Sequence, residues 1–360
     1  MASKFGPHPA VREVIRPTTL VGATRLGRRL GVELTIASET FQHTGSFKFR
    51  AAYHLAAQVP RRRIITASSG NFGQGLAFAC QLLNKSCLVV MPNTSAGTKV
   101  DAVREFGGEV ELIDVTRITR VARVGELAAL HGEAYIASPY DDPLVIEGNA
   151  TLGAELAACG ISFDSIIAPV GGGGLTSGII RGLRASGCPV QVYGAEPELA
   201  NDAARSLRSG RLLANETEPS TIADGVRTLS LGQHNWAILR EGLEGIVEVS
   251  EEQIDAVTAL AGSGPAFVYT VIEAMAQGGI KMGLSPDVAL TLATQTVLGA
   301  AQLASESKLS PEELRKMVVT PGGTTAAGLA AMEKLGTTEG LIAAIEAATK
   351  RGQEMAEENS

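Results

Sequence analysis

The pattern of apolar and polar residues changes once along the sequence, near residue 250, and this change limits the possible folds more than any other feature. From about residue 17 to 250, short apolar segments alternate with amphipathic ones. The apolar segments predict strands at 63–67, 86–91, 109–113, 165–169 and 190–195, and the segments between them predict helices at 75–82, 99–106, 118–131, 149–158 and 178–185. Such alternation is typical of an open α/β sheet, which binds ligands beyond the carboxyl ends of its strands.

After residue 250 the pattern predicts helices only, at 255–260, 266–282, 285–305 and 312–318. Residues 251–360 carry 7 Lys or Arg and 14 Asp or Glu, whereas the preceding 250 residues are neutral overall. Only two of the 15 aromatic residues, Phe267 and Tyr269, lie in this part. We therefore expect an α/β region over 1–250 and an all-helical domain over 251–360.

Composition excludes several classes of protein. The net charge of −7 argues against a nucleic-acid partner. The N-terminus has no apolar core of a secretory signal, and no uninterrupted apolar run is long enough to predict a membrane partner. The four cysteines have no metal-ligand spacing, so reduced thiols in a cytoplasmic protein are expected.

Lys48 is the first candidate for chemistry, because it lies between Phe47 and Phe49 just ahead of a helix. Apolar neighbours lower the pKa of a lysine and leave a neutral, nucleophilic amine. A lysine that only extends its charge to the surface is the alternative interpretation.

Two loops that join a strand to a helix are candidate anion sites. The loop Ser68–Ser69–Gly70–Asn71–Phe72 offers backbone N–H groups and small hydroxyls suited to a carboxylate. The loop of Gly171, Gly172, Gly173 and Gly174, followed by Leu175, lets the backbone wrap a phosphate. It matches neither a P-loop nor a dinucleotide fingerprint, and plain turns remain the alternative for both loops.

A reactive lysine, a carboxylate loop and a phosphate loop are together what a pyridoxal-phosphate enzyme acting on amino acids needs. Residues 17–250 indeed resemble the serine/threonine dehydratases and serine racemases, which are fold-type II pyridoxal-phosphate enzymes. Five segments carry the resemblance, namely FQHTGSFKFR (41–50), SSGNFGQGL (68–76), PVGGGGLTSG (169–178), AEPELAND (195–202) and TIADGV (221–226). The resemblance implies a large domain with a small domain, about 50–145, inserted in it.

The resemblance also implies roles for individual residues. Lys48 would hold the cofactor covalently and later accept the α-proton, with Phe47 beside the ring. Asn71 would bind the phenolic oxygen of the cofactor, and Gly171–Gly174 with Leu175 its phosphate. Ser68, Ser69, Gly70, Asn71 and Phe72 would bind the substrate, and Ser69 would be the opposite-face acid and base of a racemase. Glu196, Asp202 and the carbonyl of Ala200 would bind Mg²⁺ or Ca²⁺, with a solvated acidic turn as the alternative.

Residues 255–349 resemble a different family, the C-terminal dimerisation domain of pyrroline-5-carboxylate reductase. The segments are DAVTALAGSGPAF (255–267), GGIKMGL (278–284), QTVLGAA (295–301), VTPGGTTAAGL (319–329) and EAATK (346–350). The resemblance implies a homodimer or higher homo-oligomer formed through these helices. The dehydratase-like large domain is then truncated at its C-terminal end, and its strand with a partner for the cofactor's pyridine nitrogen is missing.

The sequence thus predicts a pyridoxal-phosphate lyase that eliminates water and ammonia from a small hydroxy-amino acid such as serine or threonine. Three alternatives stay open at this point, namely an amino-acid racemase, an enzyme for a specialised amino acid related to a cyclic imine, and a non-catalytic dimeric binding protein.

Overall fold

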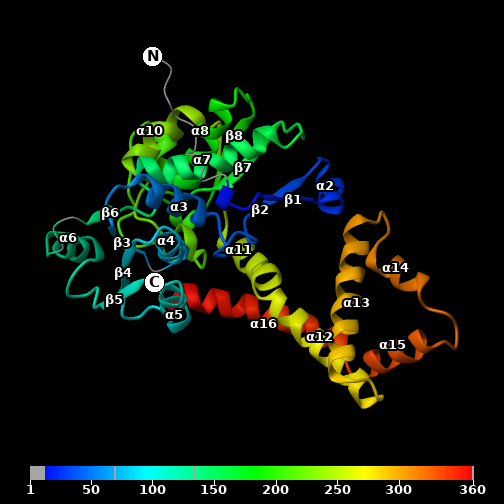
Figure 1. Cartoon of the computed structure of the whole chain (residues 1–360). Coiled ribbons are helices and arrows are strands. Elements are labelled where there is room, and N and C mark those ends of the chain that lie inside the picture. Colours follow the sequence, from blue (N-terminus) through cyan, green and yellow to red (C-terminus); the bar gives the residue numbers. More distant parts are fainter. Residues whose placement is uncertain (1–12, 69, 131, 133, 359–360) are drawn as a thin grey trace. The chain divides into compact units, whose positions relative to one another are not determined.

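The computed structural model describes residues 13–358 except 69, 131 and 133. The chain divides into two compact units (Figure 1). Unit 1 consists of the residues up to Thr19 together with Ala37–Val249. Unit 2 consists of Leu20–Ile36 together with the residues from Ser250 onward.

Unit 1 contains two parallel sheets. The first has the order β5-β4-β3-β6 and the second the order β7-β8-β9. Their bounds are β3 (Arg63–Ala67), β4 (Ser86–Pro92), β5 (Glu109–Ile113), β6 (Tyr135–Ala137), β7 (Ser165–Pro169), β8 (Gln191–Pro197) and β9 (Gly245–Val249). The five strands expected from the sequence are confirmed, and the α/β fold with them.

Helices connect these strands, as the alternation predicts. They are α3 (Lys48–Gln58), α4 (Asn71–Leu82), α5 (Gly97–Glu105), α6 (Arg120–Leu130), α7 (Pro143–Ala158), α8 (Gly174–Ala185), α9 (Asp202–Ser209) and α10 (Gln233–Gly242). Two 3-10 turns, Glu198–Ala200 and Asp224–Val226, lie in the loops around α9. The carboxyl ends of β3 and β6 lie side by side, since Thr66 is in register with Ala137 and its hydroxyl donates to the Ala137 carbonyl at 2.8 Å.

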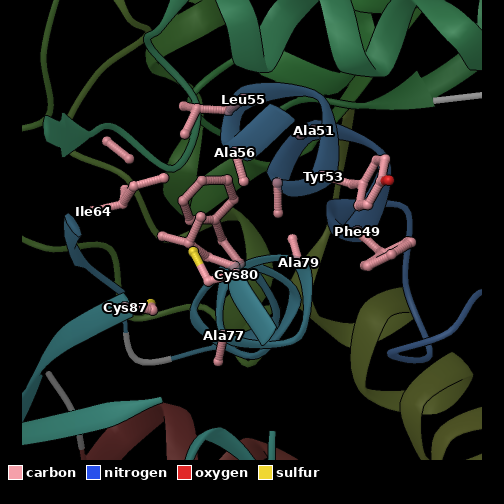
Figure 2. Close-up of a cluster of buried hydrophobic side chains, with 14 of the residues drawn as sticks. Phe49, Ala51, Tyr53, Leu55, Ala56, Ile64, Ala77, Ala79, Cys80 and Cys87 are labelled. Carbon is pink, nitrogen blue, oxygen red and sulfur yellow. The ribbon is translucent and has the colours of Figure 1, made fainter. Parts of the chain in front are cut away.

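The hydrophobic core of unit 1 fixes the start of α3. Figure 2 shows Phe49, Leu55 and neighbouring side chains of α3 against Ala79 and Cys80 of α4. Helices α3 and α7 approach each other so closely at Gly148 that a methyl group there would lie only 2.6 Å from the Arg50 carbonyl oxygen. Helix α3 is therefore held on two sides, and Lys48 begins on a rigid element.

Unit 2 is helical from residue 251 through the rest of the described chain. Its helices are α11 (Glu251–Val257), α12 (Gly264–Lys281), α13 (Pro286–Glu306), α14 (Pro311–Met317), α15 (Thr324–Lys334) and α16 (Thr337–Glu358). A π-helical turn, Thr258–Gly262, joins α11 to α12. The all-helical fold expected after residue 250 is confirmed, and Ala276, Ala289 and Ala293 form the close contact between α12 and α13.

An excursion near the N-terminus also belongs to unit 2. It contains β1 (Thr19–Gly22), α2 (Thr24–Leu30) and β2 (Thr35–Ser38), with β1 and β2 paired. This assignment differs from the expectation that residues 1–250 form one α/β region.

Two helical segments of unit 2, Glu251–Lys281 and Pro286–Glu306, are long and apolar enough to cross a membrane by length and composition alone. Only a small share of each is buried within the described structure. The expectation of no membrane partner therefore stays a prediction.

Candidate active site

Lys48 begins α3, and its amine is desolvated. The Nζ atom donates to the carbonyl oxygen of Pro139 at 3.0 Å and lies 5.1 Å from the centre of the Phe47 ring. Burial lowers the pKa of Lys48 to about 8. Phe49, in contrast, points into the core and is fully buried. The amine is thus desolvated, as its apolar neighbours suggest, whereas the roles of Lys48 and Phe47 toward a cofactor stay predictions.

Arg50, two residues further along α3, anchors the start of this helix. Its guanidinium binds Glu39 at 2.6 and 2.8 Å, Glu155 at 2.7 and 3.0 Å, and the hydroxyls of Thr18 and Thr151. The side chain is fully buried. Burial by itself lowers the pKa of Arg50, but the hydrogen bonds and charges of Glu39 and Glu155 outweigh it and raise the pKa. Because these partners come from three separate segments, the cluster fixes the position from which Lys48 projects.

The loop between β6 and α7 connects Lys48 to the glycine loop. Pro139 accepts the hydrogen bond from Lys48, and the next residue, Tyr140, packs against the glycines. A methyl group at Gly172 would lie 2.2 Å from the Tyr140 ring, and one at Gly174 would lie 2.9 Å from the Tyr140 carbonyl oxygen. The lysine amine and the glycine loop, 123 residues apart, are thus brought to two consecutive residues of one loop.

The glycine loop leads directly into α8 and is held through its carbonyl groups. The Gly172 carbonyl accepts from Asn235 Nδ2 at 2.8 Å and from the Gly232 N–H at 3.1 Å, and the Gly174 carbonyl accepts from Asn149 Nδ2 at 3.0 Å. Gly173 has φ of 91°, which favours glycine. The first N–H groups of a helix have no partner within it. With its carbonyl groups occupied elsewhere, the loop offers N–H groups to an anion.

The glycines of this loop are explained in two ways. The sequence suggested that missing side chains leave room for a phosphate. The structure adds a second reason, because Tyr140 and Val226 already approach the loop: a methyl group at Gly171 would lie 2.9 Å from the Val226 Cα.

The carboxylate loop follows β3, next to the loop that follows β6. Ser68 is buried, and its Oγ accepts from the N–H groups of Gly70 at 3.4 Å and Gly73 at 3.2 Å. Ser69 lies outside the described residues. Asn71 is exposed at the first turn of α4, whereas the Phe72 ring is buried in the core. Phe72 is therefore placed to offer its backbone rather than its ring to a substrate.

Three residues of this region were missed by the sequence reasoning. Pro139 and Tyr140 follow β6, a strand of only three residues that is too short for its alternation to be seen. Asn235 lies on the amphipathic helix α10, and nothing in its local pattern predicts that its side chain is fully buried against the glycine loop. The Pro-Tyr-Asp-Asp-Pro run at 139–143 is a signal that could have indicated a loop here.

The expected cation ligands lie at the end of β8 and the start of α9. Glu196, Ala200 and Asp202 are all buried. Burial raises the pKa of Glu196 to about 8, with Asp202 contributing, and raises that of Asp202 to about 6. Glu196 Oε1 accepts from the Ala204 N–H at 2.7 Å, and Asp202 accepts from Asn215 and from the Leu231 N–H, both at 3.0 Å. Among the residues described, no cluster of three His, Cys, Asp or Glu side chains suited to a metal occurs.

The donor set nevertheless has the chemistry of a hard-cation site, since it joins two buried carboxylates whose raised pKa values a bound cation would lower. The residues around Lys48 likewise fit pyridoxal phosphate. The amine of Lys48 is desolvated and donates to the carbonyl of Pro139. The glycine loop, whose N–H groups lie at the start of a helix, packs against the next residue, Tyr140.

Comparison with known proteins agrees with both halves of the chain. Residues 11–267 match the model of the pyridoxal-phosphate dependent enzymes, and residues 251–355 match that of pyrroline-5-carboxylate reductase dimerisation. The L-threo-3-hydroxyaspartate ammonia-lyase of Saccharomyces cerevisiae is 36% identical over 250 residues, covering 68% of this chain and 76% of that protein. Human serine racemase is 34% identical over 263 residues, covering 70% and 76%.

The fold agrees as well. The crystal structure of a T.th. threonine deaminase superposes with a TM-score of 0.65 at 37% identity, covering 81% of this chain and 90% of that one. These matches confirm the two resemblances seen in the sequence, including the fold type. The chain therefore belongs to the family of pyridoxal-phosphate dependent enzymes and carries in addition a pyrroline-5-carboxylate reductase dimerisation domain.

Proposed function

We propose that the protein is a pyridoxal-phosphate dependent ammonia-lyase that acts on a small hydroxy-amino acid such as serine or threonine. The observation that carries the proposal is the desolvated amine of Lys48, joined through Pro139 and Tyr140 to the glycine loop. The ammonia-lyase and threonine deaminase relatives support the same reaction class.

The residues divide the work as follows. Lys48 would hold the cofactor, and its neutral amine would accept the α-proton of the substrate at Nζ. The N–H groups of Gly171–Gly174 and Leu175 bind the cofactor phosphate at the start of α8. Ser68, Gly70 and Asn71 orient the substrate carboxylate and the cofactor. The cofactor, when bound, supplies the electron sink that makes the α-proton acidic.

The net reaction removes the α-proton and the β-hydroxyl as water. Hydrolysis of the dehydrated product then gives a 2-oxo acid and ammonia. Glu196, Asp202 and the Ala200 carbonyl would hold Mg²⁺ or Ca²⁺, and the cation would tie together the turn between β8 and α9.

The assembly we propose is a homodimer formed through unit 2, supported by the match of residues 251–355 to a dimerisation domain. The compartment we propose is the cytoplasm, supported by the four free cysteines, two of which are buried.

The decisive test uses purified protein loaded with pyridoxal phosphate. Wild type should show the visible absorption of lysine-bound cofactor and release 2-oxo acid from L-serine, L-threonine or L-threo-3-hydroxyaspartate. Lys48→Ala should lose both signals, and the exposed-lysine variant Lys334→Ala should keep both. A visible band that survives in Lys48→Ala contradicts the assigned role, and a wild-type band without turnover on any of the three favours a binding protein.

Racemisation is the second candidate, because human serine racemase is 34% identical. It requires an acid and base on the second face of the cofactor, for which Ser69 is the candidate. Ser69→Ala should abolish interconversion of D- and L-serine while elimination continues. Unchanged interconversion would exclude Ser69 from this role.

A further inference from the structure

The excursion Leu20–Ile36 has a surface that unit 2 alone does not cover. Helix α2 packs against α13, and Arg28 Nη2 reaches the carbonyl oxygen of Ser307 at 3.5 Å. Within the excursion only Gly27 is buried. Five large apolar side chains remain exposed, namely Val21, Leu26, Leu30, Val32 and Ile36.

A segment of this kind is not stable through its own contacts. An isolated two-stranded hairpin is at best marginally stable in water, and apolar residues that cluster on a surface usually mark an interaction site. In the structure β1 and β2 are nonetheless paired, and the Ala23 N–H donates to the Leu34 carbonyl at 2.8 Å. Its apolar surface therefore calls for a partner.

The helices of unit 2 also expose large apolar side chains. Examples on α12 and α13 are Tyr269, 64% exposed, and Leu298, 57% exposed. Residues 251–355 match a dimerisation domain, so a second copy is the occupant expected for these helices. Because α2 packs against α13, the excursion adjoins one of the helices of that dimerisation domain.

Charge favours the same occupant. The excursion carries three arginines, Arg25, Arg28 and Arg29, and one acidic residue, Glu33. All three arginines are exposed, and none forms an ion pair with another described residue. Residues 251–360 carry a net charge of −7. A basic excursion on one copy thus complements the acidic helices of another.

We propose that the excursion Leu20–Ile36 is part of the dimer contact and lies against the helical unit of the second copy. This inference rests on the proposed homodimer. It adds an element from the N-terminal end of the chain to an interface that the family match places in residues 251–355 alone.

The first test follows the wild-type protein and needs no variant. Hydrogen–deuterium exchange is measured on peptides covering 20–36 at protein concentrations below and above the dimer dissociation constant, which sedimentation equilibrium provides. The excursion should gain protection as dimers form. Peptides from α6 in unit 1 should show no change.

The second test compares two matched substitutions. Leu30→Asp changes a residue that is 60% exposed on α2, and Leu130→Asp changes one that is 75% exposed on α6. Leu30→Asp should raise the dimer dissociation constant at least about tenfold, because it introduces a negative charge where a basic, apolar surface meets an acidic partner. Leu130→Asp should change it less than about twofold. Circular dichroism checks that both variants are folded.

Each outcome bears on the proposal. Wild type that is monomeric at all concentrations overturns the homodimer and this inference together. A stable dimer with unchanged exchange at 20–36, or an unchanged dissociation constant in Leu30→Asp, overturns only the inference. Binding of the wild type to phosphatidylcholine vesicles that Leu30→Asp abolishes, without an effect on the dimer, shows that a membrane is the occupant instead.

Discussion

Replacing Lys48 by methionine should stabilise the cofactor-free protein at neutral pH. Burial lowers the pKa of Lys48 to about 8 in the folded chain from its ordinary 10.5. At pH 7, below both values, the amine is charged in both states, and the folded state bears the full penalty of about 3 kcal/mol. Methionine removes this penalty and also the hydrogen bond to Pro139, worth about 1 kcal/mol. We therefore expect a net gain of about 2 kcal/mol.

The sign of the pH dependence follows from the same two values. The penalty on wild type is complete below pH 8, declines as the pH rises from 8 toward 10.5, and disappears above the unfolded value. The advantage of Lys48→Met should hence shrink from about 2 kcal/mol at pH 7 to near zero at about pH 10.

Urea unfolding of the cofactor-free proteins at pH 7 and pH 10 measures both effects. Lys99→Met is the control in the same unit, since Lys99 forms an exposed ion pair with Asp224 and its loss should change stability by less than about 1 kcal/mol. If Lys48→Met is no more stable than wild type at pH 7, or if its advantage is the same at pH 10, the amine is not desolvated as described.

Three further predictions follow from the site. Arg50→Met should destabilise unit 1 by about 3–5 kcal/mol in urea unfolding, because two carboxylates lose their buried partner. Gly172→Ala should weaken cofactor binding at least about tenfold in a fluorescence titration, since its methyl group would lie 2.2 Å from the neighbouring tyrosine ring, whereas Gly97→Ala, with open space, should not. Added Mg²⁺ or Ca²⁺ should raise the Tm more at pH 8.5 than at pH 5.5, because protons on Glu196 and Asp202, with pKa values of about 8 and 6, compete with the cation; an equal rise at both pH values contradicts this site.

Much of the candidate site could be proposed from the sequence because its residues lie in unusual local patterns. Lys48 stands between two aromatic residues, and the glycine loop directly follows an apolar strand, so short-range pattern was enough. The strands 63–67, 109–113 and 165–169 were also placed correctly, since each is a short segment that contains Val or Ile and is flanked by turn residues.

Other features depend on the tertiary structure and leave no local trace. Asn235 looks like any polar residue on an amphipathic helix, and only the fold buries it against Gly172. Strand β6 is too short to show a period. The excursion 20–36 has the same strand–helix–strand pattern as unit 1, so its membership in unit 2 is decided by packing rather than by propensity.

This excursion also sets the order in which the protein can be completed during synthesis. Residues 20–36 leave the ribosome well before the helices of their unit, which begin only after residue 250. The more than 200 residues between them take about 10–40 s to translate at ~5–20 residues per second. During that interval the excursion lacks the helix of its own unit, α13, against which α2 packs. Dividing the gene at residue 250 likewise yields two incomplete fragments. The N-terminal fragment carries residues 20–36 without the helices of their unit, and the helical fragment lacks residues 20–36.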